Sequence, residues 1–166
     1  MNTRTDRAEP GIATAIEILQ SGGIVALPTE TVYGLAGEAL SSQACTAIFE
    51  AKDRPLSDPL IVHLPSLDWL PRLTSSSPLA LALAEKFWPG PLTMVLPKNP
   101  CVPDIVTAGQ DTVAVRMSAH PAFCSVVEGF GQPLAAPSAN RFGRISPTTA
   151  EPVSYTHLTL PTLYSV

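Results

Sequence analysis

The sequence predicts one α/β domain built on a twisted, open, mixed β-sheet that is flanked by helices. Short apolar runs of strand length alternate along the chain with segments of helical periodicity, which is the pattern of folds that pack helices on a sheet. Several connections are too short or too rich in proline for strict β-α-β units, so parallel and antiparallel strands must be mixed. The 166 residues are 45% hydrophobic, which is enough to fill one core.

Four helices are expected before residue 131, and capping residues indicate their ends. Gly22 can close the first helix by adopting a left-handed conformation. Ser41 or Ser42 can cap the start of the second. Ser77 followed by Pro78 is typical of a third helix start, and the Trp-Pro-Gly-Pro breaker at 88–91 stops that helix. The expected helices cover residues 12–19, 42–52, 78–87 and 121–130.

Five apolar runs are expected to be strands, at residues 24–28, 60–64, 93–96, 112–117 and 134–137. The first strand ends in a polar cluster that contains Thr29, Glu30, Thr31 and Tyr33. Ligands in open α/β sheets bind beyond strand ends of this kind. An ordinary turn would more often use Asn, Asp or Gly than three hydroxyls, so a binding site is favoured, with a plain strand and turn as the alternative.

The net charge of −4 and the pI of about 5.2 argue against a general nucleic-acid binder. Half of the ten cations nevertheless lie in segments that also contain polar candidate residues. These cations are Lys52, Arg54, Arg116, Arg141 and Arg144. Their convergence would suit an anionic small molecule better than a polyanion.

Three widely spaced cysteines, Cys45, Cys101 and Cys124, are expected to be buried thiols in a reducing compartment. No cysteine–histidine cluster has the spacing of a metal site, so none is expected. The polar start of the chain does not resemble a signal peptide, and no apolar run reaches membrane-spanning length. A cytoplasmic location without membrane contact is therefore expected.

Each candidate residue also has a structural interpretation. Lys52 and Arg54 could simply complement a helix C-terminus, or they could bind phosphates. His63 in an apolar strand is more often a core residue than a ligand-binding one. Arg116 in an apolar strand must be paired, either with an internal carboxylate or with a ligand that carries one.

A second polar cluster follows the expected strand at 134–137. Ser138 and Asn140 lie two residues apart and would share one side of an extended segment. Ser146 before Pro147 indicates a helix start, which explains this serine fully but can also bind an anion. The P-loop, the dinucleotide-binding glycine motif and the nucleophile-elbow motif are all absent from the sequence, so a nucleotide would be held by another route.

From about residue 6 to about residue 151, the chain resembles the YrdC-like family of threonylcarbamoyl-AMP synthases. Five segments carry the resemblance in the family's order: PTETVYGL, KDRPLSDPLIVH, FWPGPLT, VAVRM and AAPSAN. The paired pattern K-x-R and S-x-N, here Lys52, Arg54, Ser138 and Asn140, is the most specific part of it. The resemblance implies a YrdC-like fold.

The resemblance also implies an enzyme, a nucleotidyltransferase that forms threonylcarbamoyl-AMP and pyrophosphate from L-threonine, bicarbonate or CO2, and ATP. Mg²⁺ would be held mainly by the ATP phosphates. Downstream proteins would transfer the threonylcarbamoyl group to tRNA, with which this chain would make at most weak contact. The alternatives are an RNA- or nucleotide-binding module of a larger carbamoyl-transfer protein, such as a double-stranded-RNA-binding domain, and an inactive fragment.

Site residues are carried over by position. The threonine site would comprise Thr31, His63, Arg116 and the backbone of Ala136. The ATP site would comprise Lys52, Arg54, Asp58, Thr112, Ser138, Asn140 and Ser146, with Lys52 and Arg54 as the catalytic cations. Asp58 stands where related sequences often carry Asn, and its charge would repel phosphates unless Mg²⁺ or Arg54 offset it. Glu30 receives no role.

The resemblance ends near residue 151, where Pro152 would break the helix expected to start at Ser146. We expect residues 6–153 to form the family domain, incomplete at its C-terminus, and residues 154–166 to be an artefactual tail outside the family. A divergent natural strand is the alternative. The last part of the sheet would then be missing, and the activity of the chain alone would be uncertain.

Overall fold

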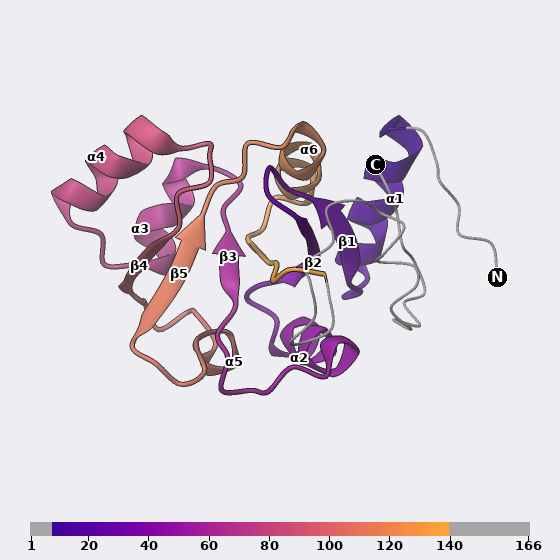
Figure 1. Ribbon diagram of the computed structural model, residues 1–166, viewed down its shortest axis with the longest axis horizontal. Helices are drawn as coiled ribbons and strands as arrows, with labels where there is room; N and C mark the ends of the chain where they lie inside the picture. Colours follow the sequence, from indigo (N-terminus) through magenta and orange to yellow (C-terminus); the bar gives the residue numbers. More distant parts are fainter. Residues whose placement is uncertain (1–7, 140–166) are drawn as a thin grey trace.

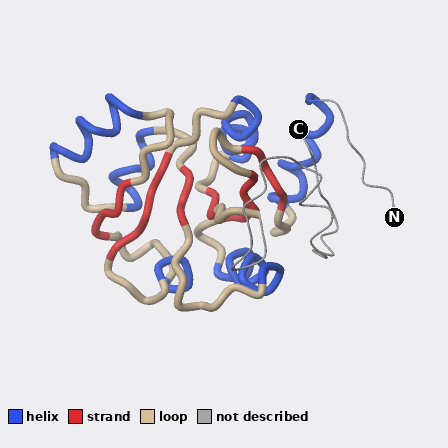
Figure 2. The backbone as a smooth tube through the Cα atoms, in the orientation of Figure 1, coloured by secondary structure: helices blue, strands red, loops and turns tan. Residues whose placement is uncertain are grey.

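A computed structural model describes residues 8–139, with side chains described from residue 11 onward. In this part of the chain a single six-stranded sheet runs through the centre of the molecule with helices packed around it (Figures 1 and 2). The strands are β1 Val25–Pro28, β2 Tyr33–Glu38, β3 Ile61–His63, β4 Met94–Pro97, β5 Thr112–Arg116 and β6 Leu134–Ala135. The helices are α1 Ala8–Gln20, α2 Ser42–Lys52, α3 Leu70–Leu73, α4 Pro78–Phe87, α5 Asp104–Thr107 and α6 Pro121–Phe130, and a 3₁₀ turn, η1 Leu67–Trp69, precedes α3.

The sheet is mixed, as the sequence predicts. Its strand order is β1-β2-β6-β3-β5-β4, with β4 and β1 at the two edges (Figure 1). β3 and β5 are parallel, and the other neighbouring strands are antiparallel. Residues 136–139 continue β6 beside β2, because Leu35 N–H donates to the Pro137 carbonyl and Ala139 N–H to the Tyr33 carbonyl. This continuation lies between the ends of β2 and β3.

Two apolar clusters fill the two faces of the sheet. Side chains alternate between the faces along each strand. On β1, Val25 and Leu27 therefore pack with α1 and α6, whereas Ala26 packs with the other face. Helices α2, α3, α4 and α5 contribute to the larger cluster on that second face. Strands β1, β2 and β6 are thus covered on both faces, whereas Val95 of the edge strand β4 is exposed.

Capping residues set the helix ends where the sequence places them. Gly22 has φ of 80°, and the N–H groups of Gly22 and Gly23 donate to the carbonyls of Leu19 and Ile18, which is the Schellman arrangement. Of the two candidate caps of α2, it is Ser41 that accepts from the Ala44 N–H. Ser77 caps α4 in the same way, with Pro78 in the first turn.

Several elements of the structure have no clear signal in the sequence. Strand β2 contains Gly34, Gly37 and Glu38, which weaken its strand pattern. The helices α3 and α5 and the turn η1 are each four residues or shorter, which is too short for a periodicity to appear. The expectation of buried thiols was also wrong for Cys101, which is exposed. No helix within residues 8–139 is long and apolar enough to cross a membrane.

Deleting part of a core side chain should test this packing. Leu27 is fully buried, so Leu27→Ala should lower the free energy of unfolding by about 2–5 kcal/mol through lost burial and the cavity that is left. Leu79 is 69% exposed on α4, so the matched change Leu79→Ala should alter it by no more than about 0.5 kcal/mol. Urea denaturation measures both values. Equal effects would contradict the assigned core.

Candidate functional site

A cavity of about 400 Å³ opens where the hairpin loop after β1 meets the carboxyl ends of β3 and β5 and the continuation of β6. His63 and Arg116 end two parallel strands and are partners in register. The carboxyl ends of parallel strands are the usual ligand site in such sheets. Seven predicted site residues line the cavity: Thr31, Arg54, Asp58, His63, Arg116, Ala136 and Ser138.

Among the described residues, the predicted site residues Lys52 and Thr112 do not line it. Lys52 is only 1% exposed, and its ammonium group donates to the Ser138 carbonyl. Thr112 begins β5, at the opposite end of the strand from Arg116, where it pairs with Pro97. Four strand residues span about 13 Å, so Thr112 lies well away from the Arg116 end. Four further predicted residues lie outside the described residues: Asn140, Arg141, Arg144 and Ser146.

A turn built on Thr29 shapes the hairpin loop. The Thr29 hydroxyl donates to the Val32 carbonyl at 2.7 Å and accepts from the Thr31 N–H at 3.2 Å. The Thr29 N–H also donates to the Val32 carbonyl, at 3.1 Å. Side-chain-to-backbone bonds of this kind stabilise tight turns. They hold Thr31 at the cavity, so the polar cluster after β1 is more than an ordinary turn.

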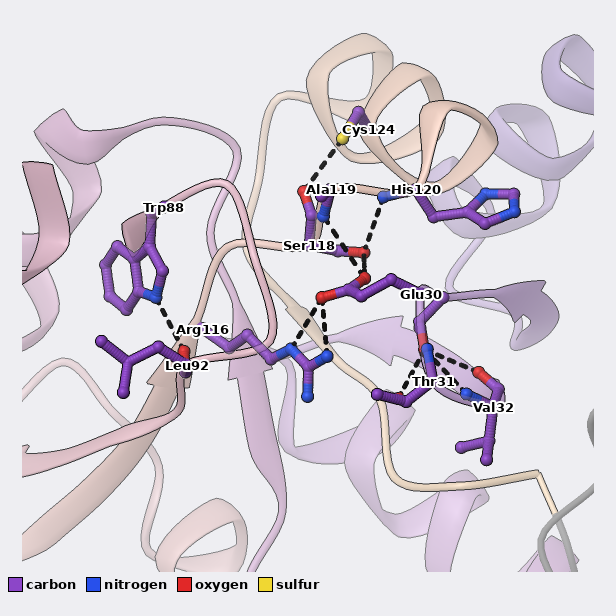
Figure 3. Close-up of polar contacts among 11 residues, drawn as sticks. Glu30, Thr31, Val32, Trp88, Leu92, Arg116, Ser118, Ala119, His120 and Cys124 are labelled. Atoms are coloured by element: carbon purple, nitrogen blue, oxygen red, sulfur yellow. Dashed lines mark hydrogen bonds and ion pairs between the residues drawn. The ribbon is translucent and has the colours of Figure 1, made fainter. Parts of the chain in front are cut away.

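Glu30, to which the sequence assigned no role, accepts four hydrogen bonds beside the cavity (Figure 3). Its Oε1 accepts from Arg116 Nη2 at 2.6 Å and from Arg116 Nε at 3.2 Å. Its Oε2 accepts from the Ser118 hydroxyl at 2.5 Å and from the Ala119 N–H at 3.3 Å. Burial alone would raise the pKa of Glu30, but hydrogen bonds from Ser118 and Arg116 lower it to about 2. The carboxylate therefore stays ionised.

His63 is buried and neutral. Its ring packs against Phe123 of α6 at 4.7 Å between centroids, on the same face of the sheet as Arg116. Burial, and then the charge of Arg116, lower the pKa of His63 to about 3, although Glu30 acts in the opposite direction. Among residues 8–139, its Nδ1 has no hydrogen-bond partner. A buried polar atom without a partner is uncommon and fits a group that meets a ligand.

Arg54 is held by its own carboxylate partner. Arg54 Nη2 lies 2.9 Å from Asp58 Oδ2, and Arg54 also donates to the backbone carbonyls of Asp58 and Pro59. Burial lowers the pKa of Arg54, and Asp58 opposes that shift. The charge of Asp58, which could repel phosphates, is thus offset by Arg54.

Lys52 is buried outside the cavity lining and contacts the lining residue Ser138. Burial, and then the charge of Arg54, lower the pKa of Lys52 to about 8, with Asp58 opposing the shift. The bond from Lys52 to the Ser138 carbonyl joins the end of α2 to the continuation of β6. Lys52 therefore positions Ser138.

The resulting site has two fixed guanidinium groups, a neutral imidazole and the hydroxyl-bearing residues Thr29, Thr31 and Ser138 around one space. Each guanidinium forms an ion pair with a carboxylate of the protein, so the cavity offers hydrogen-bond donors of fixed orientation without a large excess of positive charge. Such a set suits a ligand that carries carboxylate or phosphate groups. Within the described residues, no group of three or more His, Cys, Asp or Glu side chains could hold a metal ion.

Fold and site together define a mixed α/β domain with a cavity at the carboxyl ends of its parallel strands, lined by two arginines whose guanidinium groups suit an anionic ligand. A model of the Sua5/YciO/YrdC family, described as "Telomere recombination", matches residues 17–158. The chain belongs to this family.

Known relatives extend the comparison. A threonylcarbamoyl-AMP synthase of Pyrococcus abyssi is 48% identical over 155 residues, which cover 93% of this chain and 46% of that protein. One from Bacillus subtilis is 47% identical over 152 residues, covering 89% of this chain and 43% of that protein. The crystal structure of P. abyssi Sua5 complexed with L-threonine matches with a TM-score of 0.91 and 45% identity, over 99% of this chain and 49% of that one. The chain thus spans about half the length of these relatives.

The neutral state of His63 should make stability depend on pH. Its folded pKa of about 3 lies below the ordinary value of 6.5, so its stabilisation is complete above pH 6.5 and is lost as the pH falls toward 3. Below pH 6.5, this histidine should make the free energy of unfolding fall with a slope that approaches about 1.4 kcal/mol per pH unit, and His63→Gln should remove that contribution. Urea denaturation between pH 7 and pH 5, for the wild type and the variant, measures this slope. Equal pH dependence in both would contradict the buried, neutral histidine.

Proposed function

We propose that this chain forms threonylcarbamoyl-AMP and pyrophosphate from L-threonine, bicarbonate or CO2, and ATP. The observation that carries the proposal is that Arg116 and His63, paired at the ends of β5 and β3, line one cavity with Thr31 and Arg54. The names of the Pyrococcus and Bacillus relatives, and the threonine in the P. abyssi complex, support the substrate.

Threonine would bind through groups of four kinds. Arg116 would bind its carboxylate, because a guanidinium matches a carboxylate in shape and charge. The unpartnered Nδ1 of His63 would exchange a hydrogen bond with a polar group of the amino acid. Thr31 and the backbone of Ala136, which also line the cavity, would complete the threonine site.

ATP would occupy the side of the cavity near Arg54 and Ser138. Arg54 would contact phosphate oxygens from a position that Asp58 fixes, and Lys52 would add positive charge from behind Ser138. Asn140, Ser146 and Thr112 remain predicted contacts. Mg²⁺ would enter with ATP, held mainly by the phosphates, and would offset their charge.

The chemistry requires positioning more than a protein nucleophile. The amine of threonine takes up CO2 to form a carbamate, and a carbamate oxygen attacks the α-phosphorus of ATP as pyrophosphate leaves. Negative charge accumulates around one phosphorus atom, and fixed cations stabilise that charge without reorganising. Arg54 and Lys52 are such cations, and the pair formed by Arg116 and Glu30 would hold the amino acid in line.

We further propose a role in tRNA modification in the cytoplasm. The mixed anhydride of threonylcarbamoyl-AMP is activated, so a downstream protein must transfer its acyl group to tRNA. The acidic net charge of this chain disfavours tight binding of free RNA, so its own contact with tRNA, including double-stranded regions, would be weak.

Pyrophosphate release tests the reaction. We expect a form completed with the C-terminal half of the Bacillus subtilis relative to release pyrophosphate from ATP only when both threonine and bicarbonate are present. The 166-residue chain should bind L-threonine in calorimetry but form less product. Pyrophosphate release that does not depend on threonine, or none from the completed form, would contradict the proposal.

Arg116 provides a mutational test in the completed form. Arg116→Lys keeps the charge but loses the planar fork, so the KM for threonine should rise roughly ten- to one-hundredfold while the KM for ATP stays within about twofold. Arg72→Lys is the matched control, because Arg72 is exposed on α3 and stacks on Trp69, outside the cavity lining. Steady-state kinetics with each substrate varied in turn would measure both constants. An equal rise for ATP and threonine would contradict a specific carboxylate contact.

A further inference from the structure

We infer that Glu30 is a positioning residue for Arg116, occupying one edge of the guanidinium so that the other edge is presented to a ligand carboxylate in the cavity. The inference rests on the proposed function only for the identity of that ligand as threonine. It assigns a role to the one charged residue of the polar cluster after β1.

The geometry of the pair supports this role. Glu30 Oε1 contacts Nε and Nη2 of Arg116, which together form the side edge of the guanidinium. The remaining nitrogen, Nη1, has no hydrogen-bond partner among residues 8–139, and it points away from Glu30 (Figure 3). A guanidinium has five N–H donors in a fixed plane, so it can serve two carboxylates at two edges. Arg116 also lines the cavity, whereas Glu30 does not.

Glu30 is itself anchored, which a positioning residue requires. Its second oxygen is held by the Ser118 hydroxyl and the Ala119 N–H, just beyond the end of β5. The Ser118 hydroxyl in turn accepts from the His120 N–H at the start of α6. The carboxylate therefore ties the hairpin loop to the segment that follows β5. Arg116 cannot rotate away from the cavity without breaking this network.

The same contact could instead make Glu30 an internal competitor that occupies the place of a ligand carboxylate. A competitor would be expected on the end edge of the guanidinium, between Nη1 and Nη2, where an incoming ligand would displace it. The contacts lie on the side edge instead. The two roles predict opposite effects on affinity, because removing a competitor would strengthen threonine binding.

Calorimetry of L-threonine binding to the 166-residue chain separates the two roles. Glu30→Gln should weaken threonine binding at least tenfold and change ATP binding by less than twofold, because an amide oxygen accepts hydrogen bonds more weakly than a carboxylate and would no longer hold the guanidinium in its orientation. Glu128→Gln on the exposed face of α6 is the matched control and should change neither. Unchanged or tighter threonine binding in Glu30→Gln, or an equal loss for ATP, would overturn the positioning role.

If Glu30→Gln does not fold, Ser118→Ala provides a second test of the positioning role. It removes one anchor of the carboxylate but leaves the contact with Arg116, so threonine binding should weaken two- to fivefold with ATP binding unchanged. No change in threonine binding would overturn the inference.

A ligand-independent measurement distinguishes failure of this inference from failure of the proposed function. Nitrogen-15 NMR of the Arg116 Nε–H, assigned with Arg116→Lys, should show slow hydrogen exchange in the wild type and fast exchange in Glu30→Gln. Equal exchange in both would overturn the positioning role. If the wild type does not bind threonine at all, the proposed substrate is wrong, and the NMR result alone decides the role of Glu30.

Discussion

The arrangement of the cavity depends on the ion pair between Glu30 and Arg116. Arg116 is 9% exposed on a strand whose neighbouring side chains are apolar, and a buried cation is tolerated only when it is paired and hydrogen-bonded. Glu30 meets this requirement from a loop 86 residues earlier in the chain. The pair therefore fixes where the hairpin loop lies relative to β5, and with it the position of Thr31 in the cavity that His63 also lines.

Each of the two arginines that line the cavity is held by an ion pair with a carboxylate of the protein. Asp58 holds Arg54, and Glu30 holds Arg116, so each guanidinium is oriented before any ligand arrives. Donors fixed in advance stabilise charge without the reorganisation that mobile side chains would need. His63 stays neutral because burial and the charge of Arg116 both lower its pKa, so it adds a hydrogen-bonding atom without adding charge.

Local sequence signals predicted the elements that begin or end at capping residues, prolines or glycines. The helix at 121–130 was predicted at its observed bounds, since Pro121 and Gly131 frame an apolar stretch, and Gly22 and Ser77 ended and began helices as expected. The strand order and the contact between Glu30 and Arg116 have no local signal, because they join residues that are distant in sequence. A clue was nevertheless available: an arginine in an apolar strand requires a carboxylate partner, and Glu30 stands in the polar cluster at the end of another strand, β1.

The pairing of the K-x-R and S-x-N segments also has a physical explanation in the part of the chain that the structure describes. Lys52 ends α2 and donates to the carbonyl of Ser138, so the two segments meet across the sheet. Gly34 forms an antiparallel β-bridge with Ser138, so the continuation of β6 contacts both Gly34 and Lys52. The lysine in this place fixes the backbone at Ser138 through its hydrogen bond and also brings a positive charge close to that residue. Since burial has already lowered the pKa of Lys52 to about 8, moving Ser138 would change the geometry and the charge of the site together.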